Sequence, residues 1–187
     1  NTPMLFALAF LPMFGIGGLT GLPLGLAASD IYLHDTYYVI GHFHYVVAPG
    51  TIFALFAGIY YWFPKITGKK MSEMLGKLHF WPSLIFMNGI FMPMFIQGLA
   101  GVSRRLADGG QSYAHASGVL EWNEFMSISA FCLGLAQIPF IVWAHHMFLT
   151  GMGQAMSAFF QTTTMIISIP SVVILTSYFL SLWGGSI

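Results

Sequence analysis

Five long stretches of this chain contain no lysine, arginine, aspartate or glutamate, and this feature constrains the fold most. They cover residues 3–28, 37–63, 78–102, 125–150 and 159–183. Each exceeds the roughly 20 residues that an α-helix needs to cross the hydrocarbon of a bilayer. A segment inside lipid must satisfy its own backbone hydrogen bonds, and these stretches are too long for barrel strands. The pattern therefore predicts an all-α fold: a polytopic transmembrane helical bundle of about five spans, with residues 1–187 forming a single domain.

The composition agrees with a membrane protein. Of the 187 residues, 57% are apolar and only 6% are charged, whereas a soluble domain carries about 25% charged residues. Membrane lipid is therefore the expected surrounding, and a net charge of zero gives no basis for a nucleic-acid partner. The single cysteine, Cys132, excludes an internal disulfide and a multi-cysteine zinc site. A chain that opens on Asn1 without methionine is expected to be a fragment.

Positive charges in the loops predict an orientation. Four lysines fall within residues 65–77, between the second and third predicted spans, and the loop at 29–36 has neither lysine nor arginine. Because cytoplasmic loops carry an excess of basic residues, the lysine loop is predicted to face the cytoplasm. The stretch at 34–36 and the pair Arg104 and Arg105 then share the outer side.

The stretch HDTYYVIGHFHYV, residues 34–46, places three of the seven histidines at the head of the second span. His42 and His44 would point about 200° apart on an α-helix, so they do not suit one common metal ion. Each could instead serve a different group on opposite faces of the helix. Imidazole within a membrane is costly, is usually functional, and is a common axial ligand of heme iron. The spacing predicts two hemes flanking one helix; the alternative, in which both imidazoles only hydrogen-bond between helices, stays open.

Two further pairs lie on the predicted outer side. His34 and Asp35 offer an imidazole and a carboxylate, which together suit a divalent cation if water or another subunit completes the site; an ordinary polar loop is the simpler alternative. The guanidiniums of Arg104 and Arg105 suit carboxylates or phosphates, such as heme propionates or lipid headgroups.

The adjacent pair His145 and His146 occurs in WAHHMF. Neighbouring helical side chains diverge by about 100°, so one metal ion accepts both only where the backbone is irregular. Copper and zinc both suit imidazole, and a histidine pair at a membrane interface is the alternative. The sequence assigns no role to His79 or His115.

Four motifs together carry a resemblance to a known family. They are HDTYYVIGHFHYV, GGLTG at 17–21, SRR at 103–105 and WAHHMF at 143–148. The chain resembles the catalytic subunit of heme-copper terminal oxidases, and in particular subunit I of cytochrome c oxidase. This resemblance implies a part of a twelve-helix fold and four-electron reduction of oxygen to water, coupled to proton translocation.

The resemblance also implies roles for individual residues. His42 would ligate the high-spin, oxygen-binding heme and His44 the low-spin heme, both of heme A type, with Phe43 between them. His145 and His146 would be two of the three ligands of the copper ion, CuB, that faces the high-spin heme.

The resemblance implies further roles on the outer side and among the partners. His34 and Asp35 would bind magnesium, and Arg104 and Arg105 would hold heme propionates. The implied partners are other oxidase subunits, including the copper-bearing subunit II, with cytochrome c rather than quinol as the electron donor. The implied location is the bacterial or mitochondrial inner membrane.

The sequence also departs from the family pattern. Residues 1–137 resemble later helices of the oxidase subunit, whereas residues 142–187 resemble an earlier copper-histidine loop and the helix after it, so the order is permuted. Ile174 stands where the family often has a lysine for proton delivery. If the spans simply alternate, His145 lies a membrane thickness from His42, and we expect no heme–copper pair in this chain alone. A heme-binding membrane protein without oxygen chemistry, an oxidase-derived segment without function, and a structural or transport bundle are the alternatives.

Overall fold

A computed structural model describes residues 1–140 of the chain. The chain divides into two compact units, residues 1–137 and 138–187, and all the helices named here belong to the first. Its α-helices are α1 (Thr2–Thr20), α2 (Ala27–Leu33), α3 (Tyr37–Val47), α4 (Phe53–Thr67), α5 (Glu73–Leu99) and α6 (Trp122–Ala136). Three short helical segments join them: η1 (Pro23–Gly25), η2 (Ala48–Ile52) and η3 (Ala114–Val119). The predicted all-α fold is confirmed for the described residues.

Three stretches of this unit are long and apolar enough to cross a membrane: Thr2–Gly25, Tyr37–Thr67 and Glu73–Leu99. They correspond to the first three predicted spans. The fourth predicted span begins in α6, and its residues 141–150 lie beyond the described residues, as does the whole of the fifth.

Helix boundaries differ from the prediction at three places. The first predicted helix stops at Thr20, and Pro23 starts a separate turn because proline has no N–H with which to continue a helix. The predicted loop at 29–36 is largely the short helix α2. The third span starts at Glu73 rather than at residue 78, because the Ser72 hydroxyl caps the amide of Leu75 and an acidic residue occupies the first turn. Lys77, predicted in the loop, therefore lies on α5.

The second span is one continuous rod with a change of helix type in the middle. The five residues of η2 form a π-helix, and Pro49 lies within it. Proline removes one backbone donor, and a π segment is a common way to accommodate such a break without ending the helix. The span thus carries α3 and α4 end to end.

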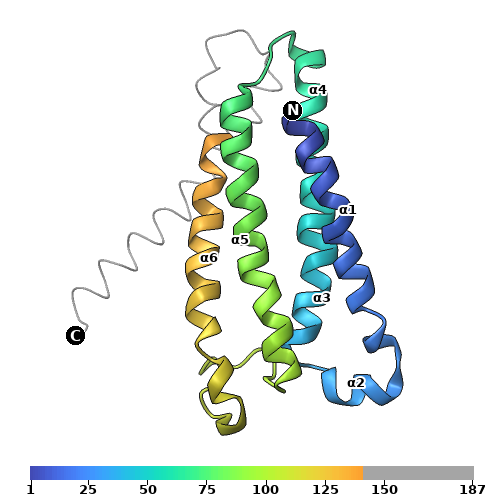
Figure 1. Cartoon of the computed structure of the whole chain (residues 1–187), viewed down its shortest axis with the longest axis vertical. Coiled ribbons are helices and arrows are strands. Elements are labelled where there is room, and N and C mark those ends of the chain that lie inside the picture. The colour runs from blue at the N-terminus through green and yellow to red at the C-terminus, as the bar shows by residue number, and fades with distance from the viewer. Residues whose placement is uncertain (141–187) are drawn as a thin grey trace, which may run out of the picture. The chain divides into compact units, whose positions relative to one another are not determined.

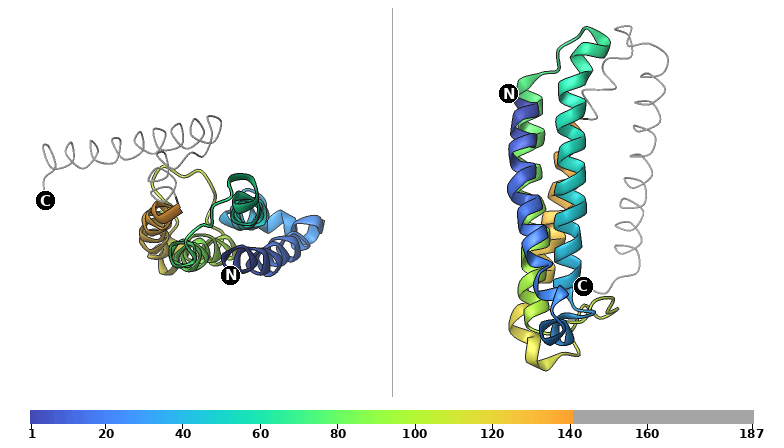
Figure 2. Two further views of the ribbon diagram at one scale, coloured as in Figure 1. Left: turned by 90° about the horizontal axis from the view of Figure 1, so that it is seen from above. Right: turned by 90° about the vertical axis from the view of Figure 1, so that its right-hand side faces the viewer.

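The long helices run up and down beside one another (Figure 1). α5 packs against α3 on one side and α6 on the other, and α1 packs against α3 and α4. The second view in Figure 2 shows α1 and the α3–α4 rod side by side. The α4–α5 connection lies at one end of the unit, whereas α2 and the α5–α6 connection lie at the other. The lysine loop and the histidine–aspartate stretch are therefore at opposite ends, as predicted.

An aromatic cluster fills the interior near the lysine-loop end. Phe6 of α1 is fully buried, and its ring centroid lies 5.3 Å from that of Phe53, 4.9 Å from that of Phe80 and 5.1 Å from that of His79. These rings come from α1, α4 and α5, so the cluster joins the three helices by apolar packing.

His79, which the sequence left without a role, is fully buried in this cluster. Its Nδ1 lies 3.1 Å from the Tyr60 hydroxyl and its Nε2 lies 3.0 Å from the Gln137 Oε1. The Gln137 amide nitrogen donates in turn to the Ser83 hydroxyl. A lone histidine inside an uncharged span was the available signal, since such residues seldom occur in lipid without partners.

Candidate functional site

His42 projects from α3 toward α1. Its Nδ1 lies 2.7 Å from the carbonyl oxygen of Gly17 and 3.3 Å from the Thr20 hydroxyl. A ring nitrogen that faces a carbonyl must carry the proton, so Nδ1 is the donor. The lone pair of a neutral imidazole then resides on Nε2, which is the nitrogen free to bind a metal.

Two glycines of the GGLTG motif bring α1 close to α3. A Cβ atom on Gly17 would lie 2.9 Å from the backbone nitrogen of Val46, and one on Gly21 would lie 2.7 Å from the Cε1 of His42. Real side chains do not approach so closely, so α1 can place its carbonyl against His42 only because these positions lack a Cβ. The motif was quoted from the sequence as part of the resemblance; its physical role becomes clear only from the structure.

His44 faces the other way, toward α5. Its Nδ1 lies 2.8 Å from the carbonyl oxygen of Ile40, one turn earlier on the same helix. Its ring stacks on Phe91, with centroids 4.6 Å apart and planes inclined by 18°. Phe43, between the two histidines, is 40% exposed. The imidazoles therefore lie against different helices, in agreement with the predicted divergence, whereas the heme-ligand roles stay predictions.

Backbone pairing joins the loop before α3 to the loop after α5. Thr36 and Ser103 form an isolated antiparallel bridge. The amide of Tyr37 donates to the Val102 carbonyl at 3.0 Å, and the amide of Arg104 donates to the Asp35 carbonyl at 2.9 Å. The two stretches that the orientation rule placed on one side of the membrane are thus in direct contact.

Arg104 and Arg105 have different surroundings in this contact. The guanidinium of Arg104 forms a salt bridge with the carboxylate of Asp35, and its side chain is 25% exposed. Arg105 is exposed and has a φ of 64°, which is uncommon for a residue with a side chain. The sequence treated the two arginines as equivalent; in the structure Arg104 is the less exposed of the two and is paired with Asp35.

His34 lies at the exposed rim of the same loop. Its side chain is 68% exposed, with Nε2 3.5 Å from the Asp35 carboxylate and Nδ1 3.8 Å from that of Asp30. Residues 1–140 contain no group of three or more histidine, cysteine, aspartate or glutamate side chains placed to hold a metal ion. A cation held by His34 and Asp35 would therefore need further ligands from water or another subunit, and this cation site stays a prediction.

Asp108 organises the loop between α5 and α6. The Ser112 hydroxyl and the amides of Gly110 and Ser112 donate to its carboxylate, and these bonds, led by the hydroxyl, lower the pKa of Asp108 below its usual 3.8. The loop is therefore held by a carboxylate that stays ionised to lower pH, on the same end of the unit as Arg104.

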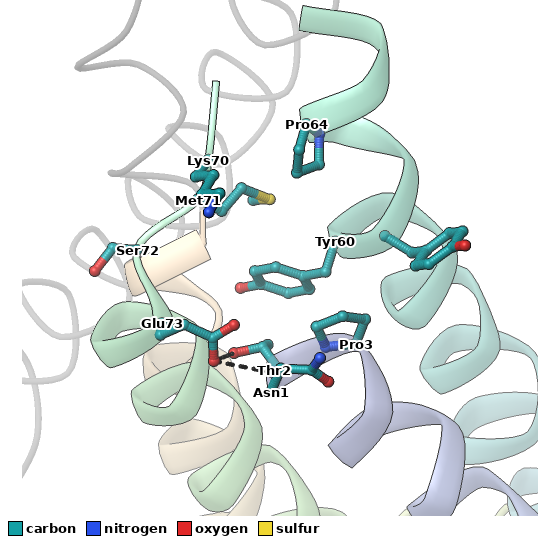
Figure 3. Close-up of a pocket in the computed structure, with 10 residues that line it drawn as sticks. Asn1, Thr2, Pro3, Tyr60, Pro64, Lys70, Met71, Ser72 and Glu73 are labelled. Carbon is teal, nitrogen blue, oxygen red and sulfur yellow. Dashed lines mark hydrogen bonds between the residues drawn. The ribbon is translucent and has the colours of Figure 1, made fainter. Parts of the chain in front are cut away.

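A cavity of about 330 Å³ lies at the opposite end, between the start of α1, the end of α4 and the start of α5. Figure 3 shows Tyr60 and Glu73 at its wall, with the Glu73 carboxylate accepting from the Thr2 amide and hydroxyl. None of its lining residues belongs to the predicted site. The predicted copper ligands His145 and His146, and Ile174, lie outside the described residues.

Comparison with known proteins decides the family. The chain matches the model of the family described as cytochrome c and quinol oxidase polypeptide I, in two stretches, residues 1–135 and 126–187. The chain belongs to this family. The oxidase resemblance is confirmed, and so is the integral membrane location, because this is a family of respiratory membranes.

Curated relatives agree with the family match. Cytochrome c oxidase subunit 1 of Synechocystis sp. is 46% identical over 142 residues, which cover 76% of this chain and 25% of the relative. The protein of the same name from Candida albicans is 44% identical over 136 residues, covering 73% of this chain and 26% of the relative. That from Cereibacter sphaeroides is 44% identical over 138 residues, covering 74% and 24%. The chain thus spans about a quarter of the length of these relatives.

Proposed function

We propose that this chain is a portion of the oxygen-reducing subunit of a respiratory terminal oxidase, and that α3 holds two hemes through His42 and His44. The placement of these two imidazoles supports the proposal most directly. Each presents Nδ1 to a carbonyl oxygen and so keeps its Nε2 for a metal, and the two lie against different helices. The donor chemistry fits heme iron, which neutral imidazole binds as an axial ligand.

The family resemblance supplies the assignment of each ligand. His42 would hold the high-spin heme and His44 the low-spin heme. The bound hemes and copper would supply electron transfer and oxygen reduction. The protein's own contribution is to fix the tautomer and direction of each ring: Gly17 and Thr20 do so for His42, and the Ile40 carbonyl does so for His44.

Outer-side residues complete the proposal. Arg104, and beside it Arg105, would face the propionate groups of the hemes, and His34 with Asp35 would share a magnesium ion with a neighbouring subunit. The proposed partners are the copper-bearing subunit II and cytochrome c. Proton translocation is proposed for the assembled oxidase. Because Ile174 stands where the family often has a lysine, the proton path along that helix differs or is lost.

Copper is proposed to require more than this chain. The family's copper ion takes a third histidine from a part of the oxidase that this chain does not match. From the resemblance we also propose that the order of the segments is permuted, so that His145 and His146 follow the stretch that contains His42 and His44 in the sequence, whereas in the family they precede it. The chain alone is therefore expected to bind heme without forming a heme–copper pair.

Heme titration of the purified chain in phospholipid nanodiscs tests the proposal. Iron protoporphyrin IX should bind, and His42→Ala and His44→Ala should each remove a different share of the reduced-minus-oxidised spectrum. His115→Ala is the matched control, since His115 is exposed and has no proposed role. Unchanged spectra in both α3 variants would contradict the ligand assignment, and stoichiometric copper in the isolated chain would contradict the expected absence of the copper pair.

A further inference from the structure

Tyr45 follows His44 on α3 and is fully buried. Its hydroxyl donates to the Oδ1 of Asn88 on α5 at 2.7 Å. A buried polar group in an apolar interior is costly unless it is paired, so this bond defines which way Tyr45 points.

The Asn88 amide is itself fixed by partners on two helices. Its nitrogen donates to the Leu84 carbonyl at 2.8 Å, one turn earlier on α5, and to the Met13 sulfur of α1 at 3.4 Å. The nitrogen is committed to these acceptors, and the oxygen therefore remains for the Tyr45 hydroxyl. One side chain of α5 thus connects α1, α3 and α5 in the middle of the bundle.

Aromatic residues on the same face of α5 hold the neighbouring positions of α3. Phe91 stacks on His44 and also contacts the ring of Tyr45, with centroids 6.3 Å apart. Phe95 stacks on Tyr45 at 5.6 Å. Since Asn88, Phe91 and Phe95 are three and four residues apart, they form one stripe along α5.

Tyr45 connects this stripe to the two histidines through its angular position on α3. At about 100° per residue, Tyr45 lies about 60° from His42 and about 100° from His44, within the arc between the two imidazoles. Rotating an α-helix by about 20° displaces a side-chain tip some 5–6 Å from its axis by about 2 Å. Metal–ligand distances tolerate only about 0.2 Å, so a helix that carries two ligands has to be held firmly against rotation.

We propose that Tyr45 and Asn88 are positioning residues: their hydrogen bond sets the rotation of α3, and so aims His42 toward α1 and His44 toward α5. The inference rests on the proposed function for its purpose, because the aimed groups are the proposed heme ligands. The rotation itself is a property of the protein without heme and can be measured separately.

The heme-free measurement uses a nitroxide on Val47→Cys, an exposed position on α3, with Cys132→Ser in the background. The full chain is placed in phospholipid nanodiscs, and the collision rate of the nitroxide with oxygen is compared among Tyr45→Phe, Asn88→Leu and the parent. Both variants remove the same bond, so both should change the nitroxide environment in the same direction, and the double variant should add little. An unchanged environment in both variants overturns the proposal.

The matched control is Tyr60→Phe. Tyr60 is a buried tyrosine of α4 whose hydroxyl bonds to His79, away from the α3 histidines. The Tyr60→Phe variant should lower the thermal unfolding midpoint, as Tyr45→Phe and Asn88→Leu should, without moving the nitroxide on α3. If it moves the nitroxide equally, the effect is general loosening and the proposal is overturned. Two variants on either side of one bond keep the test decisive if one of them does not fold.

The second readout uses iron protoporphyrin IX. In Tyr45→Phe and Asn88→Leu the affinity for heme should fall by about tenfold or more, as is typical when a residue that orients a metal ligand is lost. The absorption bands should shift in both variants. Tyr60→Phe should bind heme as the parent does. Unchanged bands and affinity beside a changed nitroxide would overturn the positioning role. A parent chain that binds no heme would contradict the proposed function, and the nitroxide result would still decide whether Tyr45 and Asn88 set the rotation.

Discussion

At the scale of single residues, the structure ties each proposed ligand to a backbone carbonyl. The Gly17 carbonyl lies against His42 and the Ile40 carbonyl against His44. Carbonyl partners are a common way to fix the tautomer of a metal-binding imidazole. The histidines themselves were predictable from their spacing, but the glycines that admit the carbonyl were not, because a close helix approach leaves no periodic signal in the sequence.

Gly21→Ala tests this close approach. The added Cβ would lie 2.7 Å from the His42 ring, so we expect the ring to be displaced and heme binding to fall. Gly21 has a φ of −76°, which alanine adopts without strain, so the effect is purely steric. The measurement is the heme affinity of the chain in nanodiscs.

Gly58→Ala is the control for that variant, since nothing lies within 4 Å of a Cβ at Gly58 in α4. Alanine there should leave heme affinity unchanged and raise stability by about 0.5–1 kcal/mol. Equal heme affinity in both variants would show that His42 does not depend on the approach of α1.

At the scale of helices, the crossing of α3 and α5 determines the site. The start of α3 approaches the end of α5 so closely that a Cβ on Gly98 would overlap the backbone nitrogen of Tyr38. One turn further along the same interface, Gly41 of α3 lies against the Phe95 ring of α5. Glycine on each helix therefore allows an approach that any larger residue would prevent.

Gly98→Ala is predicted to separate these helices. Because the obstructing atoms are backbone, they cannot turn aside, and overpacking of this kind costs about 1–3 kcal/mol. Thermal unfolding followed by circular dichroism should show a lowered midpoint. Gly134→Ala in α6, where a Cβ meets nothing within 4 Å, should show no decrease; a decrease of equal size in both variants would contradict the role of the α3–α5 crossing.

Helix boundaries show what the sequence could predict. The predicted start of the second span, Tyr37, is also the first residue of α3. The two agree because Thr36, directly before the apolar run, caps the helix. Hydrophobic length missed α2, which is too short and too exposed to have a strong pattern. It also missed the start of α5, because Glu73 and Lys77 interrupt the uncharged run without interrupting the helix.

At the scale of the molecule, the charged loops lie at the two ends of the helical unit, as the sequence predicted. The end with Arg104 also carries Asp35 and His34, and the end with the lysine loop carries the cavity beside Glu73. Length and charge predicted this polarity. They did not predict the buried hydrogen bonds of His79 and Tyr45, because a partner on another helix cannot be inferred from one sequence.

Cysteine labelling tests the orientation. In a Cys132→Ser background, Lys69→Cys should react with a membrane-impermeant maleimide only from the cytoplasmic side, and Gln111→Cys only from the outer side, because positive loops stay in the cytoplasm. Intact cells and inverted vesicles provide the two measurements. Labelling of both positions from one side would contradict the arrangement of the three spans.

The π segment in the second span determines how α4 is rotated about the helix axis relative to α3. A π turn holds more residues than an α turn, so η2 shifts the phase of α4 relative to α3. The face of α3 that bears the histidines and the face of α4 that enters the Phe6 cluster are therefore in separate registers, each set by its own neighbours. Deleting one residue from Ala48–Ile52 would rotate α4 relative to α3, so that both helices could no longer face their present neighbours at once. Every side chain outside the segment would be unchanged.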